Sequence, residues 1–454
     1  MNKYSLLITF FIHFGFLQAQ DQKVSFEIAG FPDTVAYIGY HFGNQKYLID
    51  TLSVSNDQFE LELSEVKEGI YFIYSPNYYL EFILEDTTFS LSTTKEGSYR
   101  ELEVGGSLEN QIFKEFQMTM GNLQRKQKEA FDLLKTESFD DSLRLREDYK
   151  SLAEDMDQYK SDVINNNPGT FMAAFLKLMI NITPPIFEGT DQEKRQKSYD
   201  YLVQHYFDSV DLSDPRLLRT PLLHAKVMEY FEKLVVQEPD SINKSLDRLF
   251  ARVGENEELF RYWLVSLFKK YAESKVMGMD AVMVHLIRNY YLSGRADWIT
   301  DEYEKQLREE VAYLEHNLIG KQAPPLNVVD TLLQTFQLNQ VASPYTLLFI
   351  YDPDCGHCKK SAKELEEKDA DLYNLDIQVV AVCTTTDVPR WKKFIDEHNP
   401  MWTHAIDPTG KSYFRVYYNV RSTPQVYLLD ERKTIIAKRL EIDQILDLVR
   451  HREQ

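Results

Sequence analysis

The pattern of hydrophobic and polar positions changes twice along the chain, and each change predicts a different kind of domain. Residues 20–106 alternate between apolar and polar side chains, as in Val24–Ile28 and Phe59–Leu63, and they are rich in aromatic and β-branched residues. Turn-forming residues interrupt the alternation at strand-length intervals, for example at 43–44 and 76–77. Such a pattern is typical of half-buried strands joined by turns. We therefore expect residues 20–106 to form a small antiparallel β-sandwich or barrel.

Helical periodicity replaces this alternation from residue 107 onward. Between Ser107 and Asn167 the chain has no proline and a single glycine, and it is rich in Glu, Lys, Gln and Leu. One apolar face recurs every three or four positions, at Leu108, Ile112, Phe116, Met120 and Leu123. This spacing indicates an amphipathic helix. Together with the shorter helical segments that follow, it predicts a central α-helical domain over residues 107–317.

Predicted strands and helices alternate in the last region, residues 318–454. Tyr345–Tyr351 and Ile377–Cys383 are continuous apolar runs of the length of buried strands, and a predicted helix, Gly356–Tyr373, separates them. Interleaved strands and helices are typical of α/β layer folds. We therefore expect a multidomain chain with an N-terminal all-β sandwich or barrel, a central α-helical domain and a C-terminal α/β domain.

The first 19 residues predict export. A short basic start leads into an apolar run from Leu6 to Leu17, which is shorter than the ~20 residues that a membrane-spanning helix needs. The run suits the core of a secretory signal peptide that ends at Ala19, with an uncleaved anchor as the alternative. No later stretch is long and apolar enough to span a membrane. We expect a protein of the periplasm or cell envelope, with no stable membrane insertion after signal cleavage.

The charge balance excludes nucleic acid as a partner. Lys and Arg number 51 against 71 Asp and Glu, for a net charge of −20, whereas a nucleic-acid-binding protein is expected to carry a basic patch. From Gly320 onward the counts are 17 and 19. The acidity therefore belongs to the first two-thirds of the chain, where we interpret it as a solvated surface of helices. The three cysteines are too few for a disulfide-built scaffold.

Two of the three cysteines lie in the motif Cys355-Gly356-His357-Cys358, between a predicted strand and a predicted helix. The free N–H groups and the dipole of a helix N-terminus favour an anion, so the Cys355 thiolate is stabilised there. The three-residue spacing places Cys358 one helical turn further, close enough to form a disulfide with Cys355. We expect Cys355 to attack and Cys358 to resolve the mixed disulfide. His357 can place a positive charge or a hydrogen-bond donor beside the pair, which makes the disulfide more oxidising.

Two other interpretations of the cysteine pair are an inert stabilising disulfide and half of a zinc site. Structural zinc commonly takes four ligands, but Cys383 lies in a predicted buried strand and no Cys/His pair of ligand spacing follows. We expect Cys383 to be a small buried hydrophobic residue. The segment Ala405–Ser412 imitates a phosphate-binding loop, but it lacks the opening glycine and a clean buried strand before it, so we expect an ordinary loop. No metal, nucleotide or flavin cofactor is implied.

The C-terminal region resembles the TlpA/ResA-like thioredoxin-fold thiol-disulfide oxidoreductases. The shared motifs are Gly320-x-x-Ala323-Pro324, Cys355-x-x-Cys358-Lys359-Lys360, Asp407-Pro408-x-Gly410 and Thr423-Pro424-Gln425-Val426. The resemblance implies a thioredoxin fold in which Pro424 is cis and faces the cysteines, while the backbone of Thr423 holds the extended chain of a substrate. The upstream regions resemble, in order and texture, accessory β and helical domains of unknown function that are attached to such proteins in Gram-negative bacteria.

Three positions depart from the family pattern. Phe349 stands where thioredoxins often bury a carboxylate, and Ser361 stands where ResA-like members often have a glutamate. Asp354 replaces the aromatic residue that usually precedes the first cysteine. The proton acceptor for Cys358 and the net direction of electron flow are therefore unassigned at this stage.

These observations predict an exported thiol-disulfide oxidoreductase that exchanges disulfides with envelope proteins. Its partners would be protein thiols or disulfides, together with an electron donor or acceptor in the membrane or periplasm. A peroxidase ranks lower because peroxiredoxins place a threonine three residues before the attacking cysteine, where this chain has Asp352. The alternative of another class is an envelope ligand- or protein-binding module whose thioredoxin-like domain does not turn over.

Overall fold

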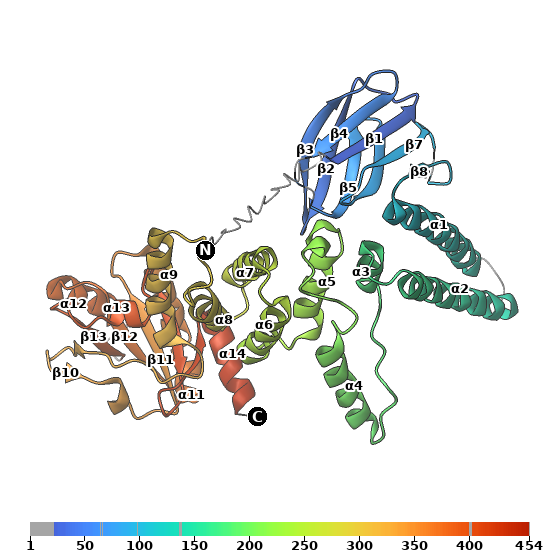
Figure 1. Cartoon of the computed structure of the whole chain (residues 1–454). Helices are drawn as coiled ribbons and strands as arrows, with labels where there is room; N and C mark the ends of the chain where they lie inside the picture. The colour runs from blue at the N-terminus through green and yellow to red at the C-terminus, as the bar shows by residue number, and fades with distance from the viewer. Residues whose placement is uncertain are drawn as a thin grey trace, which may run out of the picture. The chain divides into compact units, whose positions relative to one another are not determined.

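The computed structural model describes residues 22–453, except 64, 66, 98, 136–138 and 399–401 (Figure 1). The predicted signal peptide, residues 1–19, lies outside these residues. No helix in the described part of the chain combines the length and the apolar character that crossing a membrane requires. The chain divides into two compact units, and the boundary in the sequence lies between Leu234 and Val235. The predicted domain ends at residues 106 and 317 mark changes in secondary structure within these units, and they stay predictions.

The first unit begins with a β-sandwich. Within the described residues, two four-stranded sheets have the orders β4-β1-β7-β8 and β3-β2-β5-β6. Neighbouring strands are antiparallel, as expected, except for β1 and β7, which run parallel. The strands are β1 (Gln22–Ala29), β2 (Val35–Phe42), β3 (Gln45–Ser53), β4 (Gln58–Leu63), β5 (Gly69–Ser75), β6 (Tyr78–Leu84), β7 (Phe89–Thr94) and β8 (Glu103–Gly105).

The alternating pattern produces this sandwich because it buries one face of each strand. In β4, for example, Phe59 and Leu61 are buried while the residues between and before them are exposed. The rings of Phe26 and Phe59 are stacked with their centroids 5.0 Å apart, and Phe82 meets Phe26 edge-on at 5.3 Å. Burial of large aromatic side chains in such contacts is the main stabilisation of a small β domain. The expectation of an N-terminal all-β domain is confirmed.

Helices follow the sandwich in the first unit. They are α1 (Leu108–Leu134), α2 (Phe139–Asn166), α3 (Phe171–Lys177), α4 (Asp191–His205), the 3₁₀ helix η1 (Pro215–Arg219), α5 (Leu223–Glu229) and the π-helix η2 (Tyr230–Leu234). The first helix begins after Ser107, whose side chain caps it, and the side chain of Asn110 bonds both the N–H and the C=O of Ile83 in β6 at 2.8 and 2.7 Å. Ile112 and Phe116 are buried as predicted, whereas Leu108 is 58% exposed because Asn110 makes the contact with the sheet.

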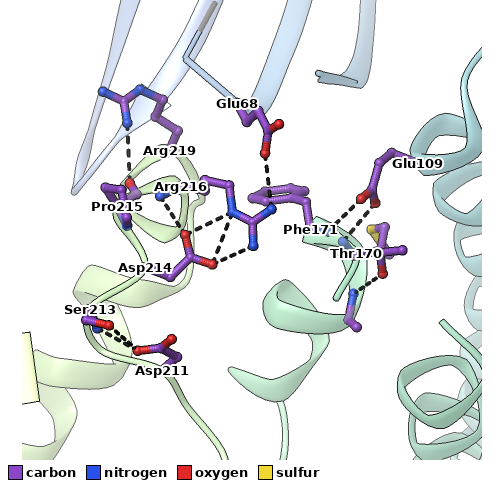
Figure 2. A network of polar contacts seen from close by, with 12 residues as sticks. Glu68, Glu109, Thr170, Phe171, Asp211, Ser213, Asp214, Pro215, Arg216 and Arg219 are labelled. Atoms are coloured by element: carbon purple, nitrogen blue, oxygen red, sulfur yellow. Dashed lines mark hydrogen bonds and ion pairs between the residues drawn. The ribbon is translucent and has the colours of Figure 1, made fainter. Parts of the chain in front are cut away.

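A network of polar contacts joins the sandwich to the helices of this unit (Figure 2). The carboxylate of Glu109 in α1 accepts the backbone N–H groups of Phe171 and Met172, at 2.6 and 3.0 Å, where α3 begins. The guanidinium of Arg216 donates to Asp214 at 2.8 Å and to Glu68, next to β5, at 3.1 Å (Figure 2). Charge-assisted hydrogen bonds of this kind are the stronger class in proteins. Each charged group of the network therefore has an oppositely polarised partner within the same unit.

The second unit begins with helices and ends with a mixed sheet. Its helices before the sheet are α6 (Pro239–Val253), α7 (Glu257–Ala272), α8 (Asp280–Leu286), the π-helix η3 (Ile287–Tyr291), α9 (Asp301–Leu314) and the 3₁₀ helix η4 (Glu315–Asn317). The helical segments of both units confirm the prediction of a central α-helical region.

The C-terminal sheet has seven strands in the order β10-β9-β13-β12-β11-β14-β15 among the residues described. Its elements are β9 (Val328–Val329), β10 (Thr335–Phe336), η5 (Leu338–Gln340), β11 (Tyr345–Tyr351), α10 (Gly356–Glu367), α11 (Asp369–Asn374), β12 (Ile377–Cys383), α12 (Val388–Glu397), β13 (Thr403–Ile406), α13 (Phe414–Tyr417), β14 (Gln425–Leu429), β15 (Ile435–Lys438) and α14 (Ile442–Arg452). Every residue of β11 is buried. The predicted helix 356–373 is divided at Lys368, where the backbone leaves the helical conformation. The expected C-terminal α/β fold is confirmed.

A buried lysine attaches the helices of the second unit to this sheet. Lys438 at the end of β15 is buried, and its Nζ forms an ion pair with Asp280, the first residue of α8. The same nitrogen donates to the carbonyl and the side-chain oxygen of Asn317, at 2.7 and 3.0 Å. Asn317 in turn donates to the carbonyl of Tyr417 at 2.8 Å. Because breaking a buried ion pair leaves an unpaired charge, this contact fixes α8 against β15.

Candidate redox site

The two motif cysteines lie where β11 passes into α10. The carboxylate of Asp352 accepts the N–H of Asp354 at 2.9 Å and the hydroxyl of Thr384 at 3.2 Å. Its carbonyl accepts the N–H of Cys355 at 3.1 Å. An aspartate that bonds the backbone two residues on stabilises a tight turn. The turn therefore delivers Cys355 to the N-cap position of α10, as the sequence predicts.

Cys355 combines partial exposure with a stabilised thiolate. Its sulfur accepts the N–H of Cys358 at 3.3 Å, and its thiol lies 3.3 Å from the carbonyl oxygen of Thr423. Partial burial opposes ionisation, but hydrogen bonds from Cys358, Thr423 and the backbone N–H of His357 outweigh it and lower the pKa of the Cys355 thiol. A lowered pKa raises the fraction of the nucleophilic thiolate at neutral pH.

Cys358 has the opposite environment. Its side chain is fully buried in the core beneath α10. Burial, together with the hydrogen bond to Cys355, raises the pKa of the Cys358 thiol to about 12. The first sulfur of the pair is thus partly exposed with a lowered pKa, whereas the second is buried and protonated at neutral pH.

The other three predicted residues line a groove of about 750 Å³, and one of them, Thr423, contacts the Cys355 thiol through its carbonyl. Thr423 and Pro424 line it, and the peptide bond between them is cis, as the family resemblance implies. His357 is exposed and lies on the same wall. The structure therefore brings all five predicted site residues, Cys355, Cys358, His357, Thr423 and Pro424, to one place.

Cys383 lies apart from this groove. It is fully buried in β12, where it is paired in register with Tyr351 of β11. Burial raises the pKa of its thiol to about 12, which is the behaviour of an inert core cysteine. Among the described residues, no group of three or more His, Cys, Asp and Glu side chains is arranged to hold a metal ion.

The loop after residue 405 binds its own backbone. The strand β13 does precede it, so the expectation that no buried strand leads into this loop is wrong. The carboxylate of Asp407 accepts the N–H groups of Thr409, Gly410 and Ser412 at 2.8–3.0 Å. Although burial opposes ionisation, these bonds lower the pKa of Asp407 to about 2. The carboxylate occupies the N–H groups that a phosphate would need, which gives a physical reason for the loop assignment.

The sequence analysis missed the part played by Asp352. Phe349, at the position where a thioredoxin carboxylate is often buried, is stacked on Tyr351 with ring centroids 5.4 Å apart. The carboxylate that bonds the turn before the cysteine pair is that of Asp352. An aspartate between the end of a buried strand and a proline is a turn signal that could have identified it.

Family models match three parts of the chain. Residues 319–438 match the AhpC/TSA family, and residues 23–113 and 164–317 match two domains of unknown function, DUF4369 and DUF5106. A comparison with curated proteins found no match.

Solved structures also resemble parts of the chain. A thioredoxin-like protein from Bacteroides caccae is 18% identical over 60% of this chain and 98% of its own length, with a TM-score of 0.45. A domain of a possible thiol-disulfide isomerase from Cytophaga hutchinsonii is 33% identical over 30% of this chain and 93% of its own, with a TM-score of 0.27. The thioredoxin domain of a thiol-disulfide oxidoreductase from Bacteroides vulgatus is 22% identical over 30% and 98%, with a TM-score of 0.28.

Proposed function

We propose that this chain, in which residues 319–438 form a thioredoxin-fold domain of the AhpC/TSA family, is a thiol-disulfide oxidoreductase that acts through Cys355 and Cys358. The observation that carries the proposal is the inequality of the two sulfurs. The pKa of Cys355 is lowered where its thiol contacts Thr423 of the groove, and the pKa of Cys358 is raised to about 12 in the core. A pair of titratable groups whose environments push their pKa values apart is suited to two successive roles.

In the reducing direction, the Cys355 thiolate attacks one sulfur of a substrate disulfide. The substrate S–S bond breaks, a mixed disulfide forms with Cys355, and the first substrate sulfur leaves as a thiolate. The sulfur of Cys358 then loses its proton and attacks Cys355, which closes the Cys355–Cys358 disulfide and releases the second substrate thiolate. The substrate gains two electrons and the cysteine pair loses them. The oxidising direction is the reverse sequence.

The groove residues support a polypeptide substrate. The backbone of Thr423, whose carbonyl already contacts the Cys355 thiol, would bond the extended chain that carries the disulfide, and Pro424 would shape the wall beside it. The partners would be envelope proteins with thiols or disulfides, and an electron donor or acceptor in the membrane or periplasm. Export rests on the predicted signal peptide over residues 1–19.

His357 would tune the redox potential of the pair. Its exposed side chain lines the groove next to both cysteines, where a positive charge favours the thiolate and hence the reduced form. We expect the couple nearer ~−180 mV than ~−270 mV, a gap of about 4 kcal/mol for two electrons. Redox titration against glutathione measures it, and a value at or below the lower figure would refute this role.

Insulin reduction in dithiothreitol tests the proposed function. We expect Cys355→Ser to abolish turnover. In a separate incubation without dithiothreitol, pre-reduced Cys358→Ser should accumulate a mixed disulfide with insulin, because the resolving thiol is missing. Cys383→Ala is the matched control, since this third thiol is buried away from the groove and should keep turnover near wild type. Equal turnover in all three variants would contradict the proposal and favour the binding-module alternative.

A further inference from the structure

The groove of about 750 Å³ lined by His357, Thr423 and Pro424, called the redox groove below, shares part of its lining with a second cavity. Arg439 and Leu440, which follow β15, line both the redox groove and a second cavity of about 250 Å³. The second cavity is also lined by the loop between α7 and α8, residues 273–279, and by the start of α8. The two cavities therefore share Arg439 and Leu440, and a segment of the helical region lines the second one.

The loop 273–279 presents apolar side chains to solvent at this border. Val276 is 51% exposed and Met277 is 37% exposed, and both line the second cavity. Neighbouring apolar groups left at the surface beside a groove are typical of a contact surface for a partner. Leu440, which is half-buried and lines both cavities, continues this apolar surface toward the redox groove.

An ion pair fixes the loop 273–279 and Arg439, which line the second cavity, relative to each other. Asp280, which directly follows the loop, is paired with the buried Lys438, and Lys438 directly precedes Arg439. One ion pair therefore holds both sides of the second cavity. The same pair cancels the charges of Asp280 and Lys438, so Lys275 and Arg439 carry the remaining charge of this cavity, and both are positive.

Arg439 itself has a backbone conformation that favours glycine. Its φ is +59°, in the left-handed region, and its N–H donates to the carbonyl of Val426 at 2.9 Å. This conformation costs free energy for any residue with a Cβ atom. An arginine at such a position, exposed on the wall shared by both cavities, indicates that its side chain serves a contact there.

We propose that the loop 273–279 and Arg439 form an extended substrate subsite, and that its occupant is the polypeptide on which the reacting disulfide is carried. Apolar side chains of that polypeptide would contact Val276 and Met277, and an acidic side chain would lie between Lys275 and Arg439. The inference rests on the proposed function, and it assigns the helical region a part in selecting apolar, acidic segments of unfolded proteins.

Two substrates with the same leaving thiol test this subsite in the full chain. One is hydroxyethyl disulfide. The other is a synthetic peptide whose single cysteine is capped by 2-mercaptoethanol and flanked on both sides by Leu-Asp pairs. The quantity measured is the ratio of kcat/KM for the peptide to kcat/KM for hydroxyethyl disulfide.

We expect the double variant Val276→Asp/Met277→Asp to lower this ratio about tenfold or more, through KM for the peptide, because lost apolar contacts are worth roughly tenfold each. The matched control is Val265→Asp, on α7 outside both cavities and 47% exposed, which should change the ratio less than twofold. An unchanged ratio in the double variant would overturn the subsite while leaving the proposed function intact. A wild-type protein that reduces neither substrate would instead overturn the proposed function.

Arg439→Gly separates the contact from stability. Glycine relieves the left-handed strain, so the midpoint of urea unfolding should not fall. The ratio for the Leu-Asp peptide should fall severalfold, and a Leu-Asn peptide should show a smaller change because it lacks the carboxylate. Equal changes for both peptides would refute the acidic preference.

Discussion

Polar groups are organised differently in the network of Figure 2, in the first unit, and in the candidate redox site of the second unit. In the first unit, Arg216 is paired with Asp214 and Glu68, and Glu109 accepts a backbone N–H at the start of α3 (Figure 2). These charged groups therefore have their hydrogen-bond partners within the network. In the candidate redox site, two chemically identical thiols have unequal surroundings, and one of them is partly exposed and contacts Thr423, which lines a groove. A network whose charged groups are all paired with one another holds secondary-structure elements together. Reactivity instead requires a group whose hydrogen-bond partners favour its charged form and leave it accessible to a substrate.

Alkylation of the two thiols gives the largest expected contrast. At pH 7 we expect iodoacetamide to modify Cys355 at least about 1000-fold faster than Cys358, because the pKa of Cys355 lies below its ordinary value and that of Cys358 is about 12. The Cys355 rate should rise with pH up to its own pKa and then level off. Mass spectrometry of each peptide measures this, with urea-unfolded protein as the control in which the two rates converge. Equal rates in the folded protein would remove the asymmetry.

Replacement of the buried Lys438 tests a fully paired polar network in the second unit, that of Lys438 with Asp280 and Asn317. We expect Lys438→Met to lower the free energy of unfolding of this unit by about 3–5 kcal/mol, since it leaves Asp280 buried without its cation. Urea unfolding measures the change. Lys438→Met/Asp280→Leu should recover much of the loss, because it removes both charges. A single variant as stable as wild type would show that the pair does not hold α8 against β15.

The carboxylate of Asp407 links stability to pH. Its folded pKa of about 2 lies below the ordinary aspartate value, so its contribution is fully present above the unfolded pKa and is lost as pH falls through the folded pKa. We expect Asp407→Asn to cost about 2–3 kcal/mol at pH 7. The gap between wild type and variant should narrow from about pH 4 downward. Denaturant unfolding at pH 7 and pH 3 checks the sign, and a gap that widens in acid would contradict it.

Substitution in the network of Figure 2 should have the smallest effect of the four experiments, and it should change stability without changing turnover. Arg216 is partly exposed, so we expect Arg216→Met to lower the free energy of unfolding of the first unit by about 1–2 kcal/mol. Lys233→Met, which removes an exposed pair with Glu229, is the control and should cost at most about 0.5 kcal/mol. The turnover of insulin should match wild type, and a loss of turnover equal to that of Cys355→Ser would break the contrast between the two units.

Much of the local structure was predictable from the sequence. The apolar periodicity located α1, α2 and the buried strands β11 and β12 because helices and buried strands are specified by residues close together in the chain. The position of the motif between a predicted strand and a predicted helix likewise placed Cys355 at the start of α10, since the turn before it depends on Asp352 and its immediate neighbours.

The predictions that differ from the structure concern features that depend on contacts between residues far apart in the chain. The parallel pairing of β1 with β7 could not be read from alternation, which shows the buried face of a strand and not its partner. The short strand β13 was missed because four residues carry little periodicity of their own. Leu108 is exposed because Asn110 contacts the sheet in its place.

The sequence by itself singled out the residues that we propose to carry the chemistry: the Cys355–Cys358 pair, His357, and Thr423 with Pro424. Only the tertiary structure decided how they work together. Folding buried the sulfur of Cys358 and brought the sulfur of Cys355 against the carbonyl of Thr423, 68 positions away in the sequence. It also placed the loop 273–279 beside Arg439. The reason is physical. Spacing along the chain sets a thiol's local geometry, whereas its pKa and the shape of its groove depend on burial and partners that folding brings from distant segments.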